Sequence, residues 1–231
     1  MGFSREELSL CEGASIPDLI GEGCRLLFVG INPGLQTAMT GIHFAHPSNR
    51  FWPALVRGGV IDWVPEVSPV TPSIAMGPDA PPGAGGDGGR GRRASEPPYP
   101  AVTGLFRLGA LGPGMTDAER DDFVGRGMGI TNLVDRATAR AAELSREELR
   151  AGGERLSSFV ARIGPAVVAV AGVTAYRDAF GHRGAALGRQ ETGLSGAELW
   201  VVPNPSGLNA HETIDSLADW YRRVANAAGV L

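Results

Sequence analysis

Two short apolar runs of this chain each end at an asparagine that is followed by proline. Residues 26–31 stop at Asn32, and residues 199–203 stop at Asn204. Steric contact with a proline ring pushes the preceding residue towards extended backbone, so each asparagine is expected at the end of a buried strand rather than inside a helix. Open α/β sheets bind their ligands at the carboxyl ends of their strands. The two turns therefore predict one cleft built from distant parts of the chain.

The remaining sequence alternates helical segments with apolar runs. At three helix starts, Ser or Thr is followed three residues later by Glu, which is the pattern of a capping box. We expect helices at residues 4–10, 49–57, 116 onwards, 145–163, 173–180 and 211–227, and strands at residues 26–31, 128–134, 166–171 and 199–203. Strands separated by helices predict a three-layer α/β/α fold with a central, mainly parallel four-stranded sheet. The 231 residues, 43% of them hydrophobic, suit a single domain over residues 1–231.

Residues 65–101 differ in composition from the segments on either side. Proline and glycine dominate this stretch, as in PPGAGGDGGRGRRASEPPYP. Such a composition buries too little apolar surface to offset the entropy lost when the chain is ordered. We therefore expect a flexible insertion within the domain, whose Arg90, Arg92 and Arg93 are candidates for contacts with phosphate.

Composition also limits the class of protein. The formal charge of −4 argues mildly against a basic nucleic-acid-binding face, although loop amides and helix N-termini can hold phosphates without much net charge. Cys11 and Cys24 have neither metal-ligand nor disulfide spacing. His46 and His211 have no partner at ligand spacing, so no metal is expected. No run approaches the ~20 apolar residues of a membrane span, and no apolar leader follows Met1. We expect a cytoplasmic protein.

The segment LLFVGINPGLQTAMTGIHFAHPSNRFW at residues 26–52 and the NPSGL of residues 204–208 carry a family resemblance. In this order they resemble the two motifs of the mismatch-specific uracil/thymine-DNA glycosylases, the bacterial Mug branch of the uracil-DNA glycosylase superfamily. Residues 127–153 also look like the central strand and helix of that family. The resemblance covers roughly residues 23–60 and 127–226. It implies an α/β/α enzyme that needs no cofactor and acts on double-stranded DNA with a mismatched or damaged base.

The resemblance implies how such an enzyme would divide its work among these loops. The target nucleotide must leave the DNA stack for a pocket where its base is stacked, read and attacked by water. Asn32 matches the position that orients the water, Phe44 the position that stacks on the base, and Leu208 the wedge inserted into the duplex. Gly207 and Asn209 match positions that touch the orphaned guanine. The candidate residues are thus catalytic Asn32; substrate-binding Ile31, Gly34, Thr37, Phe44 and Asn132; and DNA-binding Asn204, Ser206, Gly207, Leu208, Asn209 and the neighbouring Arg50.

Several of these residues also have an ordinary structural interpretation. Asn32 alone would be a plain Asn-Pro-Gly turn, and Phe44 alone would more often belong to a core. Leu208 lies among Gly and Asn, which favour an exposed turn and so suit a wedge, but it can also pack beneath the last helix. Asp135 and Arg136 are expected to form a structural ion pair rather than a catalytic one.

Two positions depart from the relatives. The best-known bacterial members of the family carry lysine where this chain has Asn132, and an asparagine there resembles the uracil-specific branches, which argues against strict dependence on a mismatch. Thr37 lies where the family borders the C5 edge of the base. Its branched side chain is expected to exclude a thymine methyl in part, because a pocket gains only ~1–3 kcal/mol from one methyl group.

The residue types also constrain the chemistry. An asparagine amide can orient water but cannot accept its proton, so stabilisation of the departing base by backbone N–H groups must supply most of the rate. A Schiff base with the sugar needs an amine. The chain contains no lysine, so only the N-terminal amine could serve, and simple hydrolysis is favoured. Together with the family resemblance, these residue types lead us to expect a monomeric, monofunctional uracil-DNA glycosylase that prefers G·U and joins the nucleoid when bound to DNA. The alternatives are a non-catalytic protein that binds mismatched or abasic DNA, and an enzyme of free nucleotides or nucleosides.

Overall fold

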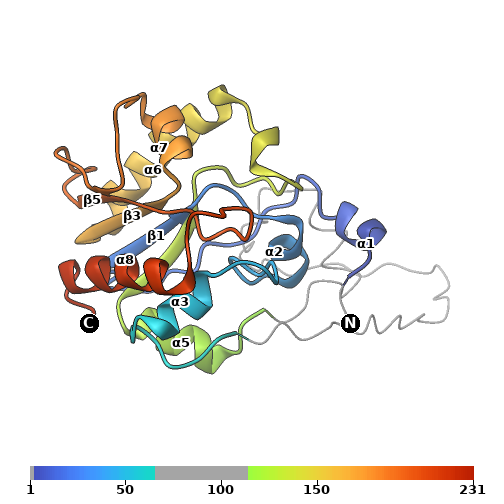
Figure 1. Cartoon of the computed structure of the whole chain (residues 1–231), viewed down its shortest axis with the longest axis horizontal. Helices are drawn as coiled ribbons and strands as arrows, with labels where there is room; N and C mark the ends of the chain where they lie inside the picture. Colours follow the sequence, from blue (N-terminus) through green and yellow to red (C-terminus); the bar gives the residue numbers. More distant parts are fainter. Residues whose placement is uncertain (1–2, 66–113) are drawn as a thin grey trace, which may run out of the picture.

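A five-stranded sheet forms the middle layer of the computed structural model, which describes residues 3–65 and 114–231 (Figure 1). The strand order is β2-β1-β3-β5-β4. The parallel strands are β1 (Leu26–Gly30), β2 (Met128–Asn132), β3 (Val167–Ala171) and β5 (Glu198–Val202). The two-residue β4 (Gly188–Arg189) pairs antiparallel with β5. The predicted parallel four-stranded sheet is confirmed, and β4 extends it by a fifth strand too short to show a periodic pattern in the sequence.

Helices cover both faces of the sheet, as the three-layer prediction requires (Figure 1). One face carries α3 (Phe51–Arg57), α5 (Asp117–Gly125) and α8 (Ile214–Ala227), and the other carries α6 (Arg146–Ile163) and α7 (Val173–Phe180). The short helices α1 (Arg5–Ser9) and α2 (Leu35–Thr40) pack against each other beside the sheet, and a 3-10 turn, η1 (Ala141–Glu143), precedes α6. The α/β/α fold is therefore confirmed.

Local capping explains where the helices start. The three predicted capping boxes are present at α1, α5 and α6. The last helix begins at Ile214 rather than at residue 211, because Thr213 provides its cap. The sequence did not predict α2, whose cap is Gly34 and so lacks the usual side-chain start signal. Nearly all of the predicted insertion at 65–101 lies outside the described residues. Within the described ranges, no helix has the length and apolar character needed to cross a membrane.

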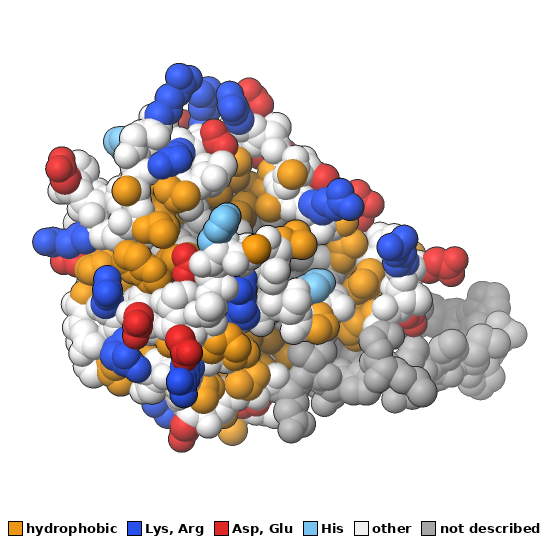
Figure 2. All heavy atoms as spheres, viewed as in Figure 1, with side chains coloured by type: hydrophobic (Ala, Val, Ile, Leu, Met, Phe, Trp, Pro, Cys, Tyr) orange, Lys and Arg blue, Asp and Glu red, His pale blue; other side chains and the backbone are white. Residues whose placement is uncertain are grey.

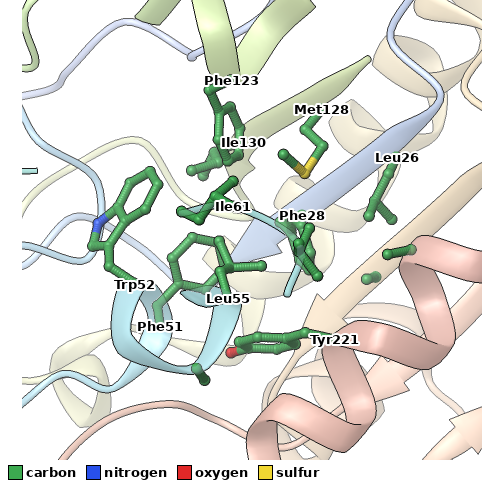
Figure 3. Packing of buried hydrophobic residues seen from close by; sticks show 14 of the residues in the cluster. Leu26, Phe28, Phe51, Trp52, Leu55, Ile61, Phe123, Met128, Ile130 and Tyr221 are labelled. Carbon is green, nitrogen blue, oxygen red and sulfur yellow. The ribbon is translucent and has the colours of Figure 1, made fainter. Parts of the chain in front are cut away.

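An aromatic cluster fixes α3 and α8 against β1 (Figure 3). The ring of Phe28 in β1 meets Phe51 edge-on at 5.1 Å and Tyr221 at 5.4 Å, and Phe51 and Tyr221 are also 5.4 Å apart. Such pairs contribute about 0.5–1.5 kcal/mol each beyond the area they bury. Because α3 follows the first motif and α8 follows the second, the cluster holds both motifs at the carboxyl ends of the strands.

The strand order places a topological switch point between β1 and β3. From β1 the chain passes to β2 on one side, and it then returns across β1 to β3 and β5 on the other. Ligands of open parallel sheets bind outside the carboxyl ends of the strands at such a point. Asn32 follows β1 directly, so it lies at the expected location of a ligand site.

Candidate active site

The two Asn-Pro turns meet beside the start of α7. Gly172 joins β3 to α7 with a φ of 108°, and its N–H group donates to Val202 O at 2.8 Å. A Cβ atom at Gly172 would lie 3.6 Å from Asn204 Cβ and 3.6 Å from Ile31 Cδ1. The ends of β1, β3 and β5 therefore converge there, with Ile31 and Asn204 on either side of the glycine.

Asn32 is held in one orientation by the loop that follows β2. Its Nδ2 atom donates to Arg136 O at 3.0 Å and to Thr138 Oγ1 at 2.7 Å. The Thr138 hydroxyl, only 1% exposed, donates in turn to Arg140 O at 2.9 Å. Both hydrogens of the Asn32 amide are thus engaged, and Oδ1 remains as an acceptor for a further donor.

Sequence reasoning assigned no role to Thr138, although it lies in a segment recognised as family-like. The loop that carries it is fastened on both sides. Thr138 N–H donates to Pro33 O at 3.2 Å, a β-bridge links Thr138 with Gly34, and Ala137 N–H donates to Ala14 O at 2.7 Å. The partners of Thr138 are remote in the chain, so no local pattern could have identified it.

Phe44 occupies a left-handed backbone conformation with a φ of 58°, which is rare outside glycine. Its half-buried ring stacks on Phe51 with 4.1 Å between centroids and 23° between planes. The buried Thr37 accepts a hydrogen bond from Ala45 N–H at 3.4 Å and so anchors the Phe44 loop. The Phe44 N–H group has no hydrogen-bond acceptor within residues 3–65 and 114–231 and can bind a ligand.

His43 secures the other side of the Phe44 loop. Its Nε2 atom lies 3.1 Å from Pro17 O, and its own carbonyl accepts from Trp52 Nε1 at 2.8 Å. The imidazole is buried, and burial lowers the pKa of His43 to about 4. The ring is therefore neutral at pH 7 and donates from Nε2 to the Pro17 carbonyl.

This burial makes the fold sensitive to acid. In the unfolded chain a histidine has a pKa of about 6.5, so the contribution of neutral His43 is complete above that pH and is lost as the pH falls towards 4. Between about pH 7 and pH 4.5 we predict that the wild type loses about 2.5 kcal/mol more unfolding free energy than His43→Gln, which keeps a donor but does not titrate. Urea unfolding of both proteins at the two pH values measures the difference. Equal losses would contradict the buried neutral ring.

Gly30 brings Phe44 and Asn132 together. A Cβ atom at Gly30 would lie 3.3 Å from Phe44 Cζ and would overlap Asn132 Oδ1. Asn132 is 7% exposed, and its side-chain amide makes no hydrogen bond to any described residue. Its carbonyl accepts from Arg155 at 3.0 Å, which fixes the backbone while the amide stays available. An aromatic ring and an unpaired amide thus flank the strand end that leads to Asn32.

The second motif forms a compact loop that displays one leucine. Asn204 Oδ1 accepts from Ser206 N–H at 3.0 Å, and Asn204 O accepts from Asn209 Nδ2 at 3.0 Å. Leu208 N–H donates to Ser206 Oγ at 3.3 Å. The Leu208 side chain is 89% exposed, so it does not pack beneath the last helix.

Arg50 lies under this loop and faces inward. Its Nη2 atom donates to Ser206 O at 2.6 Å and to Asn209 O at 2.7 Å, and its Nη1 atom donates to Glu212 O. The sequence suggested Arg50 as a ligand for DNA. In the structure, both terminal nitrogens of its guanidinium group are already bonded to protein carbonyls.

The predicted ion pair between Asp135 and Arg136 is wrong. Asp135 pairs with Arg155, and Arg136 pairs with Glu148. The Arg136 guanidinium and the capping bonds at Ser145 hold the pKa of Glu148 well below its usual range. The two neighbours in sequence do not pair with each other, because each charged side chain pairs with a residue of α6.

Charged side chains are dispersed over the face of the molecule seen in Figure 2, where basic and acidic groups are interspersed. The predicted phosphate ligands Arg90, Arg92 and Arg93 lie outside the described residues. Among residues 3–65 and 114–231, no three His, Cys, Asp or Glu side chains form a group able to hold a metal ion. The described site offers amides, backbone N–H groups and an aromatic ring.

Comparison with protein families agrees with this site. A family model of the uracil DNA glycosylase superfamily matches residues 17–228. The match includes both Asn-Pro turns, the Phe44 loop and the segment that carries Asn132 and Thr138. It covers nearly the whole chain, so the protein belongs to the uracil DNA glycosylase superfamily.

Proposed function

We propose that this protein is a monofunctional DNA glycosylase of the mismatch-specific (Mug and thymine-DNA glycosylase) branch. It would hydrolyse the N-glycosidic bond of uracil, preferentially opposite guanine, and leave an abasic site for base excision repair. Superfamily membership supports DNA glycosylase activity in general. The observation that carries the proposed excision of uracil is the meeting of Phe44 and Asn132 over Gly30, one residue from the Ile31–Asn32 turn. The proposed preference for G·U rests on the resemblance of the two motifs. We further propose that it acts as a cytoplasmic monomer on nucleoid DNA.

In this proposal the flipped base enters the space beside Gly30. The Phe44 ring offers a face for stacking, which every base can use. The Asn132 amide offers a donor and an acceptor, which can pair with O4 and N3–H of uracil. The amide makes no hydrogen bond to any described residue, so its donor and acceptor stay available for a base.

Asn32 would then orient the attacking water. With Nδ2 bound to Arg136 O and Thr138 Oγ1, the Oδ1 atom can accept a hydrogen bond from water on the sugar side of the base. The amide neither takes the proton nor supplies a negative charge. The bond must therefore break largely through stabilisation of the leaving base as an anion. The Phe44 N–H, which has no acceptor among the described residues, can contribute to this. We therefore expect slow turnover and activity on several bases that are good leaving groups. Modified cytosines would be among these further substrates.

Strand cleavage is not expected to accompany base release. A glycosylase that also nicks DNA forms a Schiff base between an amine and the opened sugar. The 231 residues contain no lysine, which leaves the N-terminal amine as the one amine that could form it. Thymine should be a poorer substrate than uracil. We propose that the branched Thr37, fixed by its bond to Ala45 N–H, restricts space for a C5 methyl group.

Substitution of Gly30 tests the proposed base pocket. In Gly30→Ala the new methyl would displace the Asn132 amide and press on the tip of Phe44, both of which are side-chain ends that can swing aside. We predict a melting temperature close to that of the wild type and a single-turnover rate on G·U lower by about 10²-fold, the scale of loss for a misplaced site. Gly125→Ala is the control, because a Cβ atom there meets nothing within 4 Å. A normal rate in Gly30→Ala would place the base elsewhere.

Labelled DNA substrates decide the proposed activity. Duplexes with G·U, A·U and G·T and a single strand with uracil are incubated with the protein and then treated with alkali, which breaks abasic sites. We expect cleavage in the order G·U, A·U, G·T, with no nick before alkali. Binding to G·U without cleavage would instead favour a non-catalytic mismatch-binding protein. Activity on free nucleosides alone would contradict both the glycosylase and the mismatch-binding function. The exposed Leu208 argues against that outcome.

A further inference from the structure

Arg50 lies where the first motif contacts the loop of the second. We call residues 204–212 the wedge loop. The Arg50 N–H group donates to Pro205 O at 3.0 Å. Two residues further on, a Cβ atom at Gly207 would overlap the backbone and side chain of Ser48. The loop therefore rests directly on residues 48–50, and its position depends on them.

The Arg50 side chain organises the interior of the wedge loop. Its guanidinium group donates to the carbonyls of Ser206, Asn209 and Glu212, which flank Leu208 on both sides. Carbonyl dipoles that point at one another repel, and a positively charged donor between the three carbonyls offsets that repulsion. The planar fork of arginine supplies several donors in fixed directions, and the single ammonium of lysine cannot reproduce that geometry.

Arg50 has no carboxylate partner within the described part of the chain. None of the ion pairs there involves it, and its buried Nε atom has no acceptor. Its three side-chain hydrogen bonds all go to the wedge loop. An arginine used as a phosphate ligand would present its terminal nitrogens to solvent, whereas here they are bonded to the loop.

We propose that Arg50 is a positioning residue that holds the wedge loop in the conformation that presents Leu208, instead of binding a DNA phosphate. The inference rests on the proposed glycosylase function only for its kinetic consequence. A preorganised loop inserts its leucine without first losing conformational entropy, which favours extrusion of a paired base.

Hydrogen exchange tests the positioning role of Arg50 without any need for enzyme activity. We compare wild type, Arg50→Lys, Arg50→Gln and Arg150→Lys, the last being an exposed arginine on α6. Amides of residues 206–211 should exchange at least about 10-fold faster in both Arg50 variants, because their protecting geometry is lost. Amides of the central strands should be unchanged, which shows that the variants are folded. Wild-type protection of the loop in Arg50→Lys would overturn the proposal.

Kinetics and salt dependence distinguish an Arg50 that positions the wedge loop from an Arg50 that binds a DNA phosphate. We expect Arg50→Lys and Arg50→Gln to release uracil from G·U at least about 10-fold more slowly, and from a single strand within about 3-fold of wild type. The slope of log affinity against log salt should not change, whereas a lost phosphate contact would reduce it by about 0.9. Rescue by lysine, equal loss on the single strand or a reduced slope would each overturn the proposal. If the wild type cleaves no substrate, the proposed function fails and the exchange experiment still decides the role of Arg50.

Discussion

Asn32→Ala is expected to lower the single-turnover rate of uracil release by about 10²-fold or more, the scale of a lost positioning or oxyanion-type contact. The structure gives the reason. Two acceptors, Arg136 O and Thr138 Oγ1, fix the amide so that Oδ1 alone is free to orient water. Alanine removes that atom and leaves the surrounding loops in place. Rapid mixing with excess enzyme measures the chemical step without interference from product release.

Binding provides the control for this variant. Affinity for G·U duplexes should survive in Asn32→Ala, because the wedge loop is untouched. Thr138→Val keeps the Asn32 amide but removes one of its two anchors, so its rate should lie between those of the wild type and Asn32→Ala. Near-normal chemistry in Asn32→Ala would remove Asn32 from the catalytic residues.

Leu208→Ala should affect substrates according to how firmly the target base is paired. The shortened side chain gives less support to the opened stack, and unstacking costs a few kcal/mol per step. We expect the rate on A·U to fall most, by about 10²-fold, the rate on the weaker G·U pair to fall less, and the rate on single-stranded uracil to change little. Because the side chain is 89% exposed, no cavity forms and the melting temperature should not change.

An exposed leucine elsewhere supplies a matched comparison. Leu10 is 68% exposed and follows α1, so Leu10→Ala removes a similar area of apolar surface outside the wedge loop. It should leave all three rates at wild-type values. If Leu208→Ala slows the three substrates equally, or lowers the melting temperature, the wedge interpretation is wrong and the leucine acts through stability.

Much of the fold was predictable because its signals are local. Apolar runs stopped by Asn32 and Asn204 indicated strand ends, and capping boxes indicated three helix starts. The described elements that were missed, α2, η1 and β4, are short and lack such signals. Gly34 cannot cap α2 through a side chain, η1 has three residues and no side-chain cap, and the two residues of β4 show no period.

The site was predictable only in part. A motif identifies which residues matter, but the direction of a side chain depends on partners that are distant in the chain. Arg50 turns inward because carbonyls more than 150 positions later converge on it. Asp135 and Arg136 do not pair with each other because each forms an ion pair with a residue of α6. Thr138 carries no pattern of its own and is recognised only by its contact with Asn32.

The strand order has a consequence for synthesis on the ribosome. β1 is made first, yet it lies between β2 and β3, and the first of these begins about 100 residues later. At roughly 5–20 residues per second, translation leaves β1 without a strand partner for about 5–20 s. Sheets with such non-local pairing fold slowly, and an unpaired apolar strand favours aggregation. The segment that leads to Asn32 is therefore open to association with other chains until β2 has been synthesised.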